Sequence, residues 1–175
     1  MTGILRIDVF FDFICPWCLI GKRQLEHAQV QFRSRYPDVQ ITTVWHGVQL
    51  LPQLPAQGEP FADFYRNRLG NADAVAMRQA QVQQAAASVG LAIDLSRIAT
   101  MPNTADAHRL FERAGTVGNA AQREMLLERL FAAYFKKGED LGCRETLLAV
   151  ARDCGIDENA VADALLGDAT LFPGS

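Results

Sequence analysis

The sequence predicts an α/β protein in which one β–α–β unit is joined to a block of helices. Three observations lead to this prediction. Residues 4–13 form an almost continuously apolar segment, a Cys-x-x-Cys motif follows it directly, and most of the chain after residue 60 shows helical patterning. A length of 175 residues fits about one domain, with room for an insertion.

The β–α–β unit is predicted from residues 4–46. Residues 4–13 are expected to form a strand that is buried on both faces, because apolar residues fill nearly every position. Pro16 suits the first position of the next helix, where its missing N–H costs nothing, and we expect this helix to end near residue 35. Residues 39–46 are rich in Val, Ile and Thr and predict a second strand. Such units are nearly always right-handed with parallel strands.

Helical patterning dominates the rest of the chain. The predicted helices cover residues 61–69, 72–89, 105–114, 119–136, 145–154 and 157–166. Asn103 or Thr104 can cap the third of them, and Gly90 and Gly138 follow two others, where glycine commonly ends a helix. Residues 1–50 are therefore predicted as the N-terminal part of the sheet-containing domain, residues 51–167 as a helical insertion domain, and residues 168–175 as a disordered tail.

Composition and charge exclude several classes of protein. Hydrophobic residues make up 49% of the chain and charged residues 21%, which argues against intrinsic disorder. The net charge of −3 gives no basic footprint, so no nucleic-acid partner is expected. No apolar run approaches the length of a membrane span, and the N-terminus lacks the pattern of a secretory signal. The sequence therefore predicts a cytoplasmic protein with no membrane partner.

The motif Cys15-Pro16-Trp17-Cys18 carries the chemistry. A cysteine at a helix N-terminus lies beside unpaired N–H groups and the positive end of the helix dipole, so the pKa of Cys15 should fall below the free value of about 8.5. Cys18 follows one helical turn later and can resolve a mixed disulfide that forms at Cys15. Pro16 removes one N–H and Trp17 adds a bulky ring, so we expect both to tune the relative stability of thiolate and disulfide.

Other interpretations of this region stay open at this point. Zinc could use the cysteines, although structural zinc needs four ligands and the chain has no second Cys-x-x-Cys. The two cysteines could also be buried and inert. Asp12 could exchange protons with the thiols or cap a turn, and His108 could tune Cys15 or serve a structural role. No metal site is predicted.

Cys143 and Cys154 lie at the two ends of one predicted helix. They are 11 residues apart in the sequence, so their Cα atoms should lie roughly 16 Å apart. A disulfide tolerates at most about 7 Å, which excludes a bond between them within the chain. We expect Cys143 to be partly exposed and Cys154 to be packed.

Residues 7–18, with Ile20-Gly21-Lys22-Arg23 after them, resemble the start of a DsbA-like thioredoxin-fold oxidoreductase of the FrnE type. The resemblance continues through residues 103–110 and 130–148. It implies a thioredoxin-like β–α–β core with a large all-helical insertion. It also implies dithiol–disulfide exchange on a thiol or disulfide substrate, either protein or small molecule, without a tightly bound cofactor. Glutathione could serve as a soluble co-substrate.

Related families support an alternative function. The 2-hydroxychromene-2-carboxylate isomerases and kappa-class glutathione transferases are similar in architecture, but typically carry Ser in place of the first Cys and use glutathione. The presence of Cys15 and Cys18 favours thiol–disulfide exchange. A glutathione-dependent isomerase or transferase is the alternative that the resemblance leaves open.

The sequence departs from the family pattern at its C-terminal end. The thioredoxin fold normally ends with a cis-proline loop, two antiparallel strands and a helix, none of which we recognise here; Pro173 is not assigned as the cis-proline. Two parallel strands alone leave edges unpaired. The chain could be truncated, another chain could supply the missing layer, or a different edge could form. We favour a homodimer that covers the exposed strand edges, and we keep open a catalytically impaired interaction module.

Overall fold

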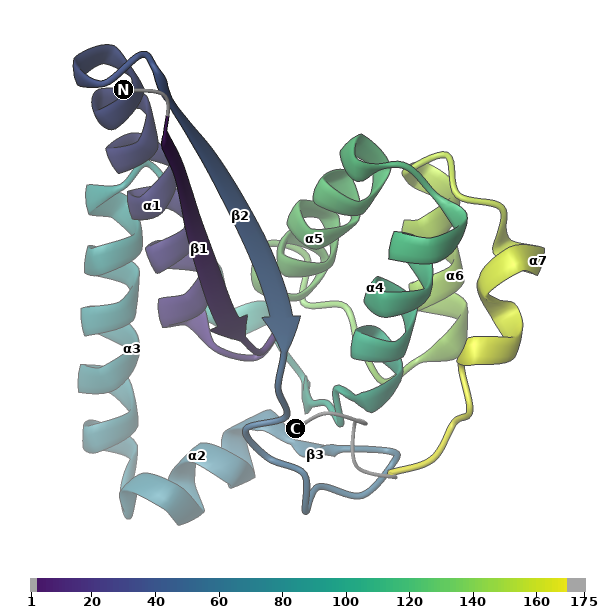
Figure 1. Ribbon diagram of the computed structural model, residues 1–175. Helices are drawn as coiled ribbons and strands as arrows, with labels where there is room; N and C mark the ends of the chain where they lie inside the picture. The colour runs from purple at the N-terminus through teal and green to yellow at the C-terminus, as the bar shows by residue number, and fades with distance from the viewer. Residues whose placement is uncertain (1–2, 170–175) are drawn as a thin grey trace.

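The computed structural model describes residues 3–169 of the chain (Figure 1). The strands are β1 (Gly3–Phe11), β2 (Val39–Gly47), β3 (Glu59–Pro60) and β4 (Thr100–Met101). The α-helices are α1 (Pro16–Arg35), α2 (Phe61–Leu69), α3 (Ala72–Ser88), α4 (Ala105–Val117), α5 (Ala120–Phe135), α6 (Arg144–Asp153) and α7 (Glu158–Val161). Short 3-10 helices cover Leu95–Arg97 and Ala162–Ala164.

The predicted β–α–β unit is confirmed. β1 and β2 pair in parallel, from Gly3 opposite Val39 to Phe11 opposite Gly47, and α1 connects them. Helix α3 packs against α1, and α4, α5, α6 and α7 form a helical block beside the strands (Figure 1). The Cys-x-x-Cys motif follows the carboxyl end of β1 and opens α1. None of the helices in the described part of the chain combines the length and the apolarity needed to cross a bilayer.

The prediction that the first strand is buried on both faces is wrong. β1 ends at Phe11, and the side chains of Ile4 and Phe10 are 76% and 66% exposed. Within residues 3–169 the main sheet contains β1 and β2 alone, and every peptide bond is trans. Successive side chains of a strand point to opposite faces, so helices that cover one face leave every second residue of β1 in solvent.

The predicted helices agree with the structure apart from a few ends. The region predicted as one helix at 157–166 instead contains the four-residue α7 and a 3-10 turn. The antiparallel pair of β3 and β4 was not predicted, because two residues are too few to show a strand periodicity. Met125, on α5, is 44% exposed.

The predicted disordered tail overlaps the described residues only at 168 and 169. Arg109 donates to Asp168 at 3.0 Å. The remainder of that tail, including Pro173, lies outside the described residues. The domain boundaries at residues 50 and 167 stay predictions.

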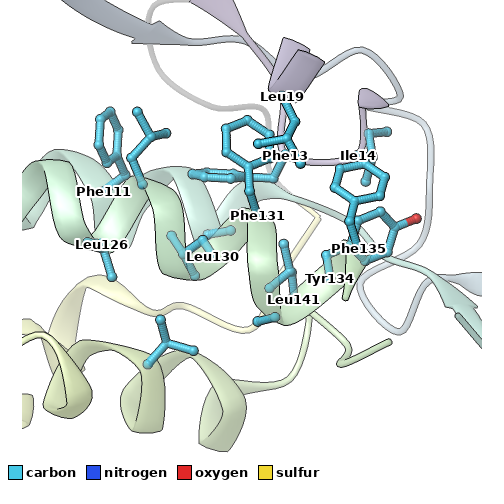
Figure 2. Packing of buried hydrophobic residues seen from close by; sticks show 14 of the residues in the cluster. Phe13, Ile14, Leu19, Phe111, Leu126, Leu130, Phe131, Tyr134, Phe135 and Leu141 are labelled. Carbon is cyan, nitrogen blue, oxygen red and sulfur yellow. The ribbon is translucent and has the colours of Figure 1, made fainter. Parts of the chain in front are cut away.

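A single hydrophobic cluster connects the strands to the helical block (Figure 2). Phe11, at the end of β1, and Phe13, just beyond it, meet the fully buried rings of Phe111 and Phe131. The ring centroids lie 5.5 Å apart for Phe11 and Phe111, and 5.4 Å apart for Phe13 and Phe131. This packing fixes the end of β1, and with it the start of the segment that carries the cysteines.

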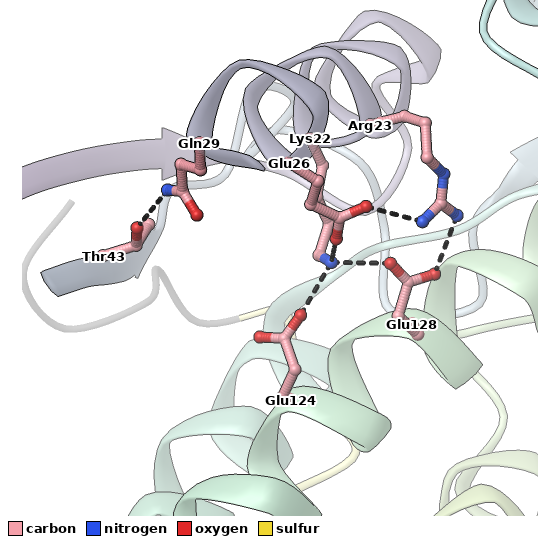
Figure 3. Close-up of polar contacts among 7 residues, drawn as sticks. All are labelled: Lys22, Arg23, Glu26, Gln29, Thr43, Glu124 and Glu128. Atoms are coloured by element: carbon pink, nitrogen blue, oxygen red, sulfur yellow. Dashed lines mark hydrogen bonds and ion pairs between the residues drawn. The ribbon is translucent and has the colours of Figure 1, made fainter. Parts of the chain in front are cut away.

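A buried lysine connects the β–α–β unit to the helical block at a second place, between α1 and α5 (Figure 3). Lys22 is 2% exposed, and its Nζ donates to Glu26 on its own helix. It also lies 2.7 Å from a carboxylate oxygen of Glu124 and 2.6 Å from one of Glu128, both on α5. Its ammonium group sits 5.8 Å from the ring centroid of Trp45. The cation is therefore neutralised by carboxylates from both parts of the fold.

Candidate active site

The two cysteines of the motif lie in the first turn of α1. Cys15 is the N-cap residue with extended backbone angles, and Pro16 follows at the start of the helix. The Cys15 N–H donates to the backbone carbonyl of Asp12 at 3.2 Å, and the Cys18 N–H donates to the carbonyl of Cys15 at 3.1 Å. These turns place both sulfurs at the helix N-terminus, as the sequence predicts. Both are partly exposed free thiols.

The environment makes the two thiols unequal. The Cys18 thiol donates a hydrogen bond to the sulfur of Cys15, and this bond is the largest cause that lowers the pKa of Cys15 to about 7. Burial opposes the shift, while the backbone N–H groups of Cys18 and Trp17 support it. The same hydrogen bond, together with burial, raises the pKa of Cys18. As the pH rises, the thiolate therefore forms at Cys15 first, while Cys18 keeps its proton.

Asp12 is fully buried beneath the motif. One of its carboxylate oxygens accepts the N–H of Leu50 at 2.8 Å, and the other lies 3.0 Å from Nε2 of His108. The carboxylate thus ties the end of β1 to the loop after β2 and to α4. Its negative charge also contributes to raising the pKa of both cysteines. Asp12 therefore has a structural role and an electrostatic influence on the thiols.

Nε2 of His108 lies 3.0 Å from a carboxylate oxygen of Asp12. It is fully buried, and its ring centroid lies 5.0 Å from that of Phe13. Gly47, at the end of β2, leaves room for it, because an added Cβ there would lie 2.3 Å from Nδ1 of His108. His108 thus holds the carboxylate of Asp12 in place beneath the motif.

A cavity of about 400 Å³ opens beside Cys15. Its walls come from the first turn of α1, from residues 50–51 after β2, and from α2, α3 and β4. Trp17, which is 44% exposed, lines it together with Cys15, whereas Cys18 does not. The first cysteine is therefore the one that a molecule in the cavity would meet.

Sequence reasoning missed the residues that α2 and α3 bring to this cavity. Tyr65 and Arg68 of α2 line it, and so does Arg78 of α3. Tyr65 and Arg68 lie three positions apart, with Phe64 and Leu69 beside them, so they share one face of α2. That spacing is visible in the sequence, but nothing in the sequence shows that this face meets the cysteines.

The described residues bring no third metal-binding side chain to Cys15 and Cys18. The group of carboxylates that could hold a cation consists of Glu26, Glu124 and Glu128, and the ammonium group of Lys22 already bonds all three. Cys143 is partly exposed and Cys154 is buried, as expected, and both are free thiols. The site geometry offers thiol chemistry without metal ligands in the described part of the chain.

Comparison with known proteins gives a consistent match over nearly the whole chain. A family model described as the DSBA-like thioredoxin domain matches residues 6–170. The uncharacterized protein YwbO of Bacillus subtilis is 25% identical over 161 residues, which cover 92% of this chain and 72% of that protein.

Solved structures show the same fold. A probable DsbA oxidoreductase from Streptomyces coelicolor superposes with a TM-score of 0.77 at 25% identity, covering 95% of this chain and 69% of that one. A 2-hydroxychromene-2-carboxylate isomerase superposes with a TM-score of 0.62 at 17% identity, covering 92% of this chain and 71% of that one. Both chains extend beyond the part that this chain matches.

Proposed function

Because the chain belongs to the DSBA-like thioredoxin domain family, we propose that it is a thiol–disulfide oxidoreductase that uses Cys15 and Cys18. The observation that carries the proposal is that the two thiols differ in pKa and in their access to the cavity. Cys15 has a pKa lowered to about 7 and lines a cavity, whereas the pKa of Cys18 is raised and its sulfur lies outside the cavity lining. A nucleophile and a resolving thiol require this difference.

The reaction proceeds in two exchanges. The Cys15 thiolate attacks one sulfur of a substrate disulfide, so a bond forms between Cys15 and that sulfur and the other substrate sulfur leaves as a thiolate. Cys18 then loses its proton to solvent and attacks the sulfur of Cys15, which releases the second substrate thiol. The protein gives up two electrons and becomes a disulfide, while the substrate disulfide becomes two thiols. The reverse direction uses the same steps.

The surroundings assist each step. The hydrogen bond from Cys18 holds the thiolate at Cys15 before attack, and it disappears when Cys15 becomes part of a mixed disulfide. The same event removes the negative charge of Cys15, which is one of the causes that raise the pKa of Cys18. Formation of the mixed disulfide therefore activates the resolving thiol.

Several narrower expectations belong to this proposal. The substrate is a thiol or a disulfide, glutathione could act as a soluble co-substrate, and the protein works in the cytoplasm. No bound cofactor takes part, since the cysteine pair itself stores the electrons. The fold similarity to an isomerase at 17% identity concerns the fold alone and adds no second function.

The proposal is tested by trapping the intermediate. The reduced wild-type protein should react with a small disulfide to give an internal Cys15–Cys18 bond, detected by peptide mass spectrometry. Cys18→Ser should stop at a mixed disulfide on Cys15, and Cys15→Ser should form neither product. Cys143→Ser serves as the matched control and should behave as the wild type. If the wild type forms no internal bond at any disulfide concentration, the proposed function is wrong.

A further inference from the structure

We propose that the cavity beside Cys15 selects thiols and disulfides that carry a negative charge close to the reactive sulfur. The inference rests on the proposed function and adds the chemical class of its substrate. It is carried by the composition of the cavity wall: apolar side chains, the nucleophilic cysteine and two arginines, with no carboxylate among the lining residues.

Apolar side chains line the cavity together with Cys15. Trp17 comes from its own helix, Leu50 from the loop after β2, and Phe64 from α2. Leu50 and Trp17 are 54% and 44% exposed, so they present apolar surface to solvent at the mouth of the cavity. A ligand that covers them gains free energy in proportion to the apolar area it buries. The body of the substrate is therefore expected to be apolar or aromatic.

Two arginines supply the charge selection. Arg68 and Arg78 line the cavity from α2 and α3. Neither forms an ion pair or a side-chain hydrogen bond with any of residues 3–169. By contrast Arg66, on another face of α2, pairs with Asp63 at 3.4 Å. The cavity thus holds two guanidinium groups whose donors are available, in a protein whose net charge is −3.

The arginines and the thiolate act on a common neighbour. Tyr65 also lines the cavity. Burial is the main cause that raises the pKa of its hydroxyl, Cys15 adds to the rise, and Arg68 and Arg78 oppose it. A guanidinium fork binds a planar carboxylate by two hydrogen bonds. A substrate whose carboxylate binds at Arg68 or Arg78 would therefore place its sulfur within the same cavity as Cys15. The electrons move as in the proposed exchange, and the arginines take no covalent part.

The test compares two aromatic disulfides that differ in charge. Dithiobis(nitrobenzoate) carries a carboxylate on each half, and dithiodipyridine is uncharged at neutral pH. Their rates of reaction with Cys15 are measured by stopped flow in the wild type and in the double variant Arg68→Gln/Arg78→Gln. We expect the rate with the anionic probe to fall roughly fivefold, as two partly screened ion pairs would give, and the rate with the uncharged probe to stay within about twofold.

The control is the double variant Arg33→Gln/Arg35→Gln. These arginines are exposed and occupy the last turn of α1. Their replacement removes the same net charge as the cavity variant. They lie about 25 to 30 Å along the helix from Cys15, well beyond the screening length at physiological salt. Alkylation by uncharged iodoacetamide reports whether either variant changes the thiolate itself. If both double variants slow the anionic probe equally, or if the cavity variant slows both probes equally, the inference is overturned.

The same measurements distinguish a failure of the proposed function from a failure of the charge selection. If neither probe converts the wild type to the internal disulfide, the oxidoreductase proposal fails, whatever the charge selection. If both probes do so at rates that Arg68 and Arg78 do not influence, the proposed function stands and charge selection fails.

A second pair of probes identifies the source of the anionic group. Two short peptides are used, each activated at its cysteine as a thiopyridyl mixed disulfide, one with Glu on both sides of that cysteine and one with Lys. Charge selection with the peptides indicates a polypeptide substrate. Selection with the aromatic probes alone indicates a small molecule, and either result supports the inference.

Discussion

At Cys15, the hydrogen bond from the Cys18 thiol is the largest influence that lowers the pKa, to about 7. The alkylation rate of reduced Cys15 should therefore rise with pH around a midpoint near 7 and level off above it. In Cys18→Ala the donor is lost, so the midpoint should move up toward the ordinary pKa of a free cysteine. Cys18→Ser keeps a hydroxyl donor and should fall between them. Site-resolved mass spectrometry of iodoacetamide labelling gives these midpoints.

The same shift sets a pH dependence of stability in the reduced protein. Since the folded state lowers the pKa of Cys15, its contribution to stability is complete above the ordinary pKa of a free cysteine and is lost as the pH falls through about 7. Cys18, with its raised pKa, lowers stability as the pH rises above that ordinary pKa. If the alkylation midpoint of Cys15 is the same in Cys18→Ala as in the wild type, the hydrogen bond from Cys18 does not lower the pKa of Cys15. Cys143→Ser should leave the midpoint unchanged.

Part of the site could be predicted from single residues and part could not. The spacing of Cys15 and Cys18, with Pro16 between them, predicted the helix start and the position of both thiols in its first turn. Asp12 and His108 were noted as candidates, but they are 96 positions apart in the sequence and nothing local shows that they pair. Their contact depends on how α4 packs under the end of β1, which is a tertiary property.

On the scale of elements, Lys22 holds α1 against α5. Burial alone would lower the pKa of Lys22, but its hydrogen bonds to Glu124, Glu128 and Glu26 outweigh this and raise it. Helical periodicity predicted α1 and α5 separately. It could not predict their contact, because Lys22 and Glu128 are 106 residues apart.

Replacement of Lys22 should therefore destabilise the fold. In Lys22→Met the three carboxylates lose their shared cation, and we expect a loss of about 1–3 kcal/mol in the free energy of unfolding. This is less than for a fully buried pair, because the glutamates keep contact with water. Urea denaturation measures it. The control is Arg152→Met, which removes an exposed pair with Glu158 and should cost under about 1 kcal/mol.

The dependence of stability on pH below neutrality provides a further check on the ion pairs of Lys22. The salt bridges lower the pKa of Glu26 from 4.5 against the opposing effect of burial, so its contribution is present above pH 4.5 and is lost below it. The difference in stability between the wild type and Lys22→Met should shrink as the pH falls through this range. An undiminished difference at low pH would show that Lys22 acts by packing alone.

On the scale of the whole molecule, the strand pair and the helical block share one core. The fully buried ring of Phe131 in α5 lies 5.9 Å from Phe11 and 5.4 Å from Phe13, measured between ring centroids. The sequence predicted a domain boundary near residue 50 because strand patterning stops there. Local patterning could not show that aromatic side chains from both sides would meet in one cluster.

The whole-molecule prediction is a single unfolding transition. The measurement uses Trp17→Phe as the background, because the chain has two tryptophans and only Trp45 lies in β2. The fluorescence of Trp45 then reports on the strands, while far-ultraviolet circular dichroism reports mainly on the helices; the two curves should coincide. Phe131→Ala should lower both midpoints together, with a loss of about 3–5 kcal/mol, since it opens a cavity between the two parts. Met125→Ala, on the exposed side of the same helix, should change little. If Phe131→Ala shifts the circular dichroism curve and leaves the Trp45 curve in place, the helical block unfolds independently. The boundary near residue 50 would then separate two cooperative units despite the shared core.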